Sequence, residues 1–134
     1  MNYNPTREEI DFVRKALTQY NEEVAEGENH REFNIVQYDD TGNIIAGLLG
    51  GTYWGWLYIN ILWIEKSHRH KGLGTKLVLE AEKEALQRKC EFAHLDTMSF
   101  QALKFYKKLG YKVKTVIKDI PKGHKKYIMI KRLR

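Results

Sequence analysis

Near the N-terminus, apolar residues recur every three or four positions, as they do along one side of an α-helix. These residues are Ile10, Val13, Leu17, Tyr20 and Val24. Thr6 and Glu9 have the spacing of a capping box, and Gly27 follows the pattern, so we expect a helix that runs to about Ala25. An amphipathic helix of this kind is predicted to cover one face of a sheet.

Denser apolar runs follow the helix and predict strands. The predicted strands span residues 33–38, 44–53 and 56–64. The first two form a hairpin across a polar turn at 39–43. The third is almost continuously apolar, which is typical of a central strand buried on both faces. Gly47, Gly50 and Gly51 interrupt the second strand and predict a bulge or a close backbone approach.

Helical and strand-like patterns then alternate to the C-terminus. The predicted elements are a helix at 75–88, a strand at 92–96, a helix from Ser99 to Gly110, and strands at 111–117 and 125–133. Ser99 is the expected N-cap and Gly110 the expected C-terminal stop. This order predicts one α/β (α+β) domain over residues 1–134, with a mixed sheet and helices on both faces.

A glycine-containing loop joins the strand at 56–64 to the helix at 75–88. It reads Arg69-His70-Lys71-Gly72-Leu73-Gly74. Glycines let the backbone approach a ligand closely, and a helix N-terminus offers free N–H groups and partial positive charge. These features favour a phosphate or pyrophosphate site. The spacing excludes a P-loop, and Leu77 stands where a dinucleotide-binding fingerprint has its third glycine.

Two segments carry a resemblance to a known family. Arg69, Gly72 and Gly74 fit the pattern Arg/Gln-x-x-Gly-x-Gly/Ala. Ala102, Tyr106, Gly110 and Tyr111 fit Asn-x-x-Ala-x-x-x-Tyr-x-x-x-Gly-Phe/Tyr, with Ser99 in place of the Asn. In order and spacing, residues 33–134 resemble the GNAT N-acetyltransferase superfamily, in which the loop binds the pyrophosphate of acetyl-CoA.

The resemblance implies that the strands at 56–64 and 92–96 diverge to admit the acyl-CoA. It also implies a backbone N–H near residues 62–64 that polarises the thioester carbonyl. The cofactor-binding residues that it implies are Leu62, Trp63, Ile64, Arg69, His70, Lys71, Gly72, Leu73, Gly74, Thr75, Ser99, Ala102 and Tyr106. The shorter side chain of Ser99 puts the usual Asn contact in doubt.

Tyr106 is the candidate general acid, because a phenol can donate a proton to a departing thiolate. Its other interpretation is a core tyrosine on an amphipathic helix. The general base is open: Asn60 stands where many relatives carry a carboxylate, and an amide cannot accept the proton. The alternatives are Glu65, His94, Asp96, His124, a water chain or an amine that arrives neutral. We favour His124 as the side chain that shapes the acceptor site.

These residues predict an N-acetyltransferase that carries an acetyl group from acetyl-CoA to a primary amine of a small molecule or peptide, by direct attack in a ternary complex. A non-catalytic, regulatory CoA-binding module is the alternative that Asn60 and Ser99 suggest. A basic nucleic-acid-binding domain is a third interpretation.

The net charge of +6 is unevenly distributed. Residues 1–32 carry four basic and eight acidic side chains, whereas residues 101–134 carry twelve basic and one acidic. The lysines are not interleaved with stacking aromatics, so the basic region suits polyanionic CoA better than nucleic acid. The sequence has no long apolar run, no secretory pattern and no metal-binding spacing, and its single thiol, Cys90, is expected to be inert. A cytoplasmic, metal-free protein is therefore expected.

An aromatic cluster surrounds the turn before the third strand. It comprises Tyr53, Trp54, Trp56, Tyr58 and Trp63. It is open to three interpretations: core packing, an aromatic-walled acceptor pocket, or the contact surface of a homodimer. Acidic residues are sparse near this turn, which argues against a highly cationic acceptor.

Overall fold

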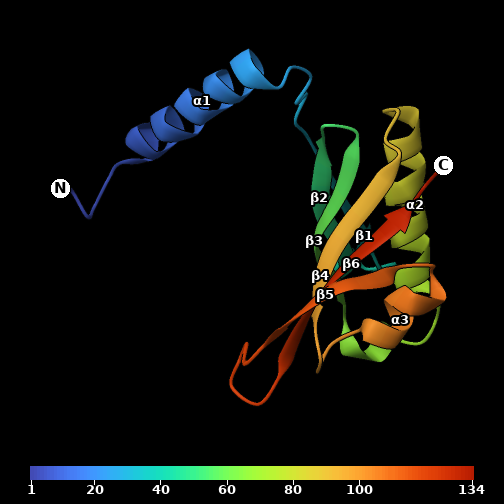
Figure 1. The fold of residues 1–134 in the computed structure, drawn as a ribbon. Coiled ribbons are helices and arrows are strands. Elements are labelled where there is room, and N and C mark those ends of the chain that lie inside the picture. Colours follow the sequence, from blue (N-terminus) through green and yellow to red (C-terminus); the bar gives the residue numbers. More distant parts are fainter.

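The computed structural model describes residues 1–134 as a six-stranded sheet with three α-helices (Figure 1). The elements in chain order are α1 (Arg7–Val24), β1 (Arg31–Tyr38), β2 (Ile44–Tyr53), β3 (Trp56–Ile64), the short 3-10 helix η1 (Lys66–His68), α2 (Leu73–Gln87), β4 (Phe92–Met98), α3 (Leu103–Lys108), β5 (Lys112–Lys118) and β6 (Lys125–Arg132). The predicted fold class, a mixed and mostly antiparallel sheet in an α+β arrangement, is confirmed. None of the helices has the length and apolar character needed to cross a membrane.

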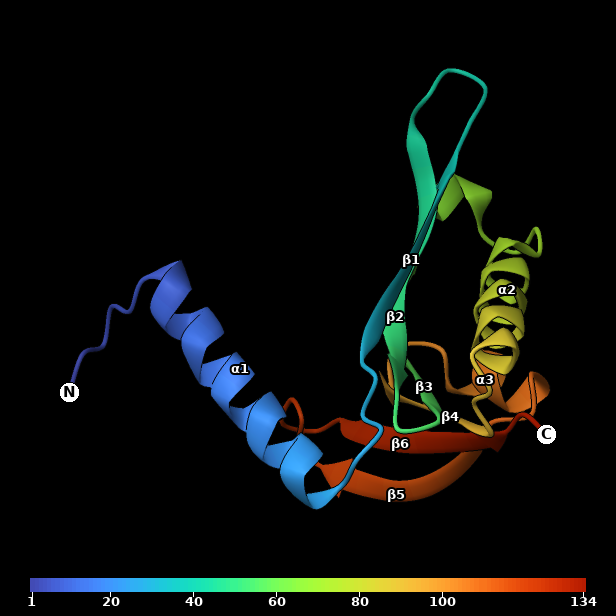
Figure 2. The same ribbon diagram turned by 90° about the horizontal axis from the view of Figure 1, so that it is seen from above.

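The strands are arranged in the order β1-β2-β3-β4-β6-β5, and only β3 and β4 run parallel. The helices α2 and α3 lie together on one side of this sheet (Figure 2). The apolar stripe of α2, including Leu77, Val78 and Ala81, packs against sheet residues such as Leu57 and Met129. This stripe forms the main core on the helix that the sequence predicts at 75–88.

The end of α3 follows the sequence prediction, whereas its beginning does not. Gly110 has a φ of +93°, the N–H of Tyr111 donates to the carbonyl of Tyr106, and that of Gly110 donates to Lys107. This is a Schellman motif, which satisfies carbonyls at the helix end. The prediction of Ser99 as the N-cap is wrong, because α3 begins at Leu103 and its N-cap is Ala102. The Ser99 Oγ instead accepts from the N–H of Lys125, at the start of β6.

The first helix begins with the predicted capping box between Thr6 and Glu9, but it does not cover the sheet. None of its residues is buried. Both views show α1 extending away from the sheet, on the side opposite α2 and α3 (Figures 1 and 2). The prediction that α1 covers a sheet face of its own chain is therefore wrong: helical periodicity indicates that a helix has an apolar side, and not what that side contacts.

The central strands separate part-way along their length. The parallel pairing runs from Trp56 opposite Phe92 to Ile59 opposite Leu95 and stops there. At the same level, on the edge of β3 that pairs with β2, Gly50 is opposite Ile59 and Leu49 is opposite Ile61. Asn60 is therefore an extra residue in a bulge of β3. A side chain at Gly50 would collide with the carbonyl of Tyr58. The close approach predicted from these glycines is thus confirmed, and the expected divergence begins at the bulge.

A buried polar cluster ties α2 to β6 and to the residue that precedes β5. The carboxylate of Glu82 is 7% exposed; it accepts from the Tyr111 hydroxyl at 3.0 Å and from the Lys131 ammonium at 2.9 and 2.8 Å. Burial, followed by the charge of Glu82, raises the pKa of Tyr111, so its hydroxyl remains a donor. All three groups therefore stabilise one another where desolvation would otherwise be costly.

We expect Glu82→Ala to lower the free energy of unfolding by about 2 kcal/mol, since it leaves the Tyr111 hydroxyl and the Lys131 ammonium without their shared partner. Urea unfolding followed by circular dichroism measures the change. Glu80→Ala, at an exposed position of the same helix, is the matched control and should stay within about 0.5 kcal/mol of the unmodified protein. Equal effects of the two substitutions would contradict the role of the cluster.

Candidate active site

The loop before α2 presents a run of backbone N–H groups that nothing in the protein uses. From His70 to Thr75, no N–H donates a hydrogen bond to another group of the chain, and no side chain caps the helix. His70 and Gly72 have positive φ angles of 61° and 83°. Turns with left-handed residues gather successive N–H groups into anion-binding concavities, and the helix N-terminus adds partial positive charge. The loop therefore fits a pyrophosphate.

The two glycines of this loop serve different purposes. A side chain at Gly72 would meet no atom within 4 Å, so this glycine is required for its left-handed backbone and not for space. A Cβ at Gly74 would lie 3.2 Å from the ring of Phe105 on α3. Gly74 thus permits α2 and α3 to pack closely. These distances concern groups of the protein alone, so the close approach of a ligand to both glycines stays a prediction.

Charged and apolar groups attach the loop to the end of β3. Arg69, predicted as support for phosphate, donates through Nε to the carbonyl of Ile64 at 3.0 Å. Lys71 and Lys76 are exposed and free of ion pairs. Ile64 lies 3.9 Å from the position of a Cβ on Gly74, so the strand end and the loop are neighbours. The predicted cofactor residues of β3 and of the loop are therefore brought together.

Beyond Ile59, the side of β3 that faces β4 has no strand partner. Leu62, Trp63 and Ile64 lie in this stretch, where the sequence predicts the N–H that polarises a carbonyl. Leu62 and Ile64 pack towards the core, while Trp63 is 45% exposed on the opposite face. The separated strands thus leave backbone groups available between them.

Tyr106 combines a buried ring with an accessible hydroxyl. The residue is 6% exposed, and its hydroxyl makes no hydrogen bond within the chain. The hydroxyl oxygen is not fully buried, so it can be reached by solvent or a ligand. Burial, with a smaller contribution from the charge of Asp96, raises the pKa of Tyr106 to about 12. The phenol therefore keeps its proton throughout the neutral range and can donate it. Ala102 lies one turn earlier on the same element and donates its N–H to the Thr97 hydroxyl.

The two predicted residues Ser99 and His124 meet away from the glycine loop. The Ser99 hydroxyl lies 3.3 Å from His124 Nδ1, and the His124 ring packs edge-on against Phe100. Both groups are exposed. The Ser99 hydroxyl is thus engaged with the β5–β6 connection, which leaves it less free for a cofactor than the family's Asn would be.

Among the candidate bases, Glu65 is the least suited. Its carboxylate accepts from the Ser67 hydroxyl, the Ser67 N–H and His68 Nδ1 in the η1 turn. These hydrogen bonds, that of the Ser67 side chain first, lower the pKa of Glu65 to about 2, so the group is a very weak base. Asn60 is exposed at the bulge.

His94 has the properties that Glu65 lacks. Its Nε2 lies 2.9 Å from the Tyr53 hydroxyl, and burial lowers its pKa against the opposing effect of Asp96, so the imidazole is neutral at pH 7. It is one position before the point where β3 and β4 separate. The sequence could not rank His94 above the other candidates, because its contacts come from strands 41 positions apart in the chain. No group of three or more His, Cys, Asp or Glu side chains is placed to hold a metal ion.

The model of the acetyltransferase (GNAT) family matches residues 3–111 of the chain. The chain belongs to the GNAT acetyltransferase family. Members of this family use acetyl-CoA. A blasticidin-S acetyltransferase from Streptomyces morookaense is 34% identical over 95 residues, which cover 70% of either chain.

Two solved structures are similar to this GNAT protein over almost its whole length. An acetyltransferase from Bacillus cereus is 36% identical, with a TM-score of 0.85 over 98% of this chain and 96% of that chain. A protein assigned as an acetyltransferase from Agrobacterium tumefaciens is 30% identical, with a TM-score of 0.89 over the same shares. Both alignments are long enough to include α1.

We expect Gly74→Ala to lower the melting temperature of this GNAT protein, because the added Cβ presses on the Phe105 ring. Phe105→Leu should be destabilising alone, yet Gly74→Ala combined with Phe105→Leu should cost less than the two single changes together. A double-mutant cycle on urea unfolding measures this coupling, which should exceed about 0.5 kcal/mol. Simple additivity would show that α2 and α3 do not meet at this contact.

Proposed function

We propose that this GNAT protein transfers an acetyl group from acetyl-CoA to a primary amine of a small molecule or peptide, by direct attack of the amine in a ternary complex. The run of free N–H groups from His70 to Thr75, next to the separated strands, carries the proposal. These N–H groups supply hydrogen-bond donors for a pyrophosphate. They lie at the place from which the thioester end of the cofactor could reach the gap between β3 and β4.

Acetyl-CoA supplies an acetyl group that is already activated as a thioester. The N–H groups of the loop would bind the pyrophosphate, and the exposed ammonium groups of Lys71 and Lys76 would add charge-assisted support. A free N–H of β3 near Leu62–Ile64 would accept the carbonyl oxygen as negative charge develops on it.

Tyr106 would protonate the departing sulfur. With a pKa of about 12, its phenol is always in the donor form between pH 6 and 10, although it is a weaker acid than a free phenol. An amine that arrives uncharged needs no strong base, which is consistent with Asn60 at the bulge and with the very low pKa of Glu65. His94 is the neutral imidazole next to the opening of the strands.

Ligand-dependent thermal unfolding tests the cofactor assignment. Acetyl-CoA and CoA, at about a hundred times their Kd, should stabilise the protein by about 2.7 kcal/mol and raise its melting temperature by several degrees, whereas ATP and a short oligonucleotide should not. Gly72→Val should abolish the shift by distorting the left-handed turn. Gly42→Val is the matched control, because Gly42 also has a positive φ (85°) and open space around it, yet lies in the β1–β2 turn.

Loss of the CoA shift in Gly42→Val, or its retention in Gly72→Val, would mean that the loop is not the pyrophosphate site. A shift with the oligonucleotide alone would favour the nucleic-acid-binding interpretation of the basic C-terminal region.

Acetyl transfer itself is tested by following release of the CoA thiol with a panel of amines that includes blasticidin S. We expect Tyr106→Phe to lower kcat by about 10²- to 10⁴-fold, with little change in CoA affinity. Tyr111→Phe is the control, since its hydroxyl is bound to Glu82 and should affect stability more than kcat. In the unmodified protein kcat should not fall between pH 7 and 10, because the raised pKa keeps Tyr106 protonated there.

An unchanged kcat in Tyr106→Phe would remove this hydroxyl from the mechanism. A non-catalytic CoA-binding module is the second candidate, favoured by Asn60 at the bulge and by the engaged Glu65 carboxylate. It predicts the CoA-induced shift without turnover of any amine.

A further inference from the structure

The first helix carries an apolar stripe that contacts nothing in its own chain. The exposed fractions of Val13, Leu17, Tyr20 and Val24 lie between 59% and 70%. The helix is nevertheless capped at its N-terminus and has the sequence pattern of a helix that packs against a partner. Isolated helices of this length are marginal in water, so most of the stability of α1 must come from packing.

The face of the sheet opposite α2 and α3 is also uncovered; we call it the open face. The strand register places on it Tyr53, Trp56, Tyr58, Phe92, His94, Ile128 and Ile130. Six residues line a hollow of about 370 Å³: Tyr53, Trp54, Trp56, His94, Ile128 and Ile130. Apolar exposure continues at the far ends of β2 and β3, where Leu49, Ile61 and Trp63 are 39–49% exposed. Apolar patches of this extent mark interaction sites.

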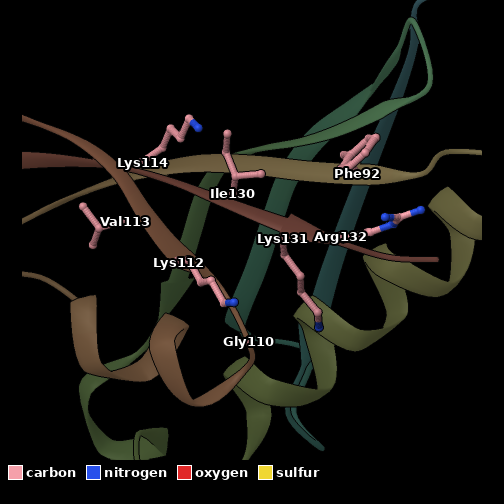
Figure 3. Close-up of a pocket in the computed structure, with 8 residues that line it drawn as sticks. All are labelled: Phe92, Gly110, Lys112, Val113, Lys114, Ile130, Lys131 and Arg132. Carbon is pink, nitrogen blue, oxygen red and sulfur yellow. The ribbon is translucent and has the colours of Figure 1, made fainter.

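Basic side chains border one end of the open face, and the carboxylate of Asp96 on the same face is paired with Lys126 at 3.6 Å. Ile130 also lines a second hollow, of about 550 Å³, together with Lys114 and Arg132 (Figure 3). In this view, Phe92, Ile130 and Lys114 point to the same side of the strands. The Arg132 guanidinium lies 5.9 Å from the ring centre of Phe92. The open face thus combines an apolar centre with a basic border at one end.

The charge of the N-terminal segment is complementary to that border. Residues 1–32 carry eight acidic and four basic side chains, and residues 101–134 carry one acidic and twelve basic. Within α1 itself, five acidic and three basic side chains leave a net negative charge, which is opposite to the charge of the basic end of the open face. Such complementarity favours one pairing and orientation over others.

The linker keeps α1 from reaching the open face of its own chain. The Trp54 indole donates to the carbonyl of Ala25 at 3.1 Å, and the Trp54 N–H donates to that of Glu28 at 2.8 Å. The Glu22 carboxylate accepts from the N–H groups of Gly27 and Glu28. These contacts hold the end of α1 at the β2–β3 turn and direct the helix outwards (Figure 2). The alignments with the two solved relatives are long enough to include α1.

We propose that the chain forms a twofold dimer in which α1 of each copy packs across the open face of the other. A twofold operation turns one projecting helix and one open face into two identical contacts. Each α1 contributes Tyr20, whose ring buries roughly 150–250 Å², together with the aliphatic side chains of Val13, Leu17 and Val24. With the area they cover on the sheet, and with both contacts counted, the total approaches the roughly 1,200–2,000 Å² of a stable interface.

This arrangement also places α1 of the partner beside His94, at the opening between β3 and β4. Under the proposed function, the amine would approach on this face, since the glycine loop and α3 occupy the other. The partner helix would then form one wall of the acceptor site. The dimer itself does not depend on the proposed function, and its test uses no activity measurement.

Sedimentation velocity on the full chain, from about 1 to 100 µM, tests the proposal. The unmodified protein should have twice the 15.8 kDa mass of one chain. The double variant Leu17→Glu/Tyr20→Glu on the stripe should be monomeric. Thr18→Glu/Gln19→Glu is the matched control, since it adds the same charge at exposed positions on the polar side of α1 and should stay dimeric.

A second variant tests the face on which α1 packs. Ile130→Glu should also give a monomer, because it places an acidic group where an acidic helix docks. Mixing it with Leu17→Glu/Tyr20→Glu should restore a weak heterodimer, since one intact α1 then meets one intact open face. Circular dichroism melts establish that each variant is folded.

A monomeric unmodified protein at 100 µM would overturn the proposal. So would a folded Leu17→Glu/Tyr20→Glu variant that remains dimeric. A dimer that survives Ile130→Glu would show that α1 contacts some other surface, which also contradicts the exchange of helices.

Discussion

The separation of β3 from β4 beyond Ile59 and Leu95 is the constraint on which the candidate site depends. A parallel pair that continued would use its backbone groups in hydrogen bonds and close the sheet. The bulge at Asn60 shifts the register of β3 against β2 at this point, and bulges increase local twist. The strands then leave polar backbone groups that need partners. A thioester carbonyl and the amide groups of a pantetheine chain are partners of the right kind.

The glycine loop and α3 are both positioned by this separation. Arg69 fastens the loop to the last carbonyl of β3, and Gly74 lets α2 lie close against Phe105. Tyr106 follows Phe105 in the chain, so the packing that sets the loop also sets the ring of the candidate acid. One set of contacts, on one side of the sheet, therefore positions both the loop that would bind the cofactor and the tyrosine that would donate the proton.

The sequence predicts best those features that depend on neighbouring residues. The capping box at Thr6, the stop at Gly110 and the glycine loop before α2 all follow from local backbone preferences. The order of elements and the family resemblance then lead to the fold.

Features that depend on distant partners were missed or misjudged. Ser99 has the position of a helix cap in the sequence, but its hydroxyl accepts a hydrogen bond from the N–H of Lys125 on β6. The contact between Gly74 and the ring of Phe105 joins two helices and could not be predicted from the spacing of the loop. The buried cluster of Glu82 with Tyr111 and Lys131 joins residues that are far apart in the chain, and no pattern in the sequence indicates it. The placement of α1 depends on contacts of Trp54 that no periodicity encodes.

The burial of Cys90 has a consequence for the redox chemistry of the protein. It is the only sulfhydryl of the chain, it is 1% exposed, and burial raises its pKa. Exchange between thiols and disulfides requires an accessible thiolate, and Cys90 offers neither the access nor the charge. Under the proposed function, transfer of the acetyl group from acetyl-CoA releases a free thiol next to the protein at each turnover. Because Cys90 is the only thiol of the chain and is buried, it is poorly placed to form a mixed disulfide with that product.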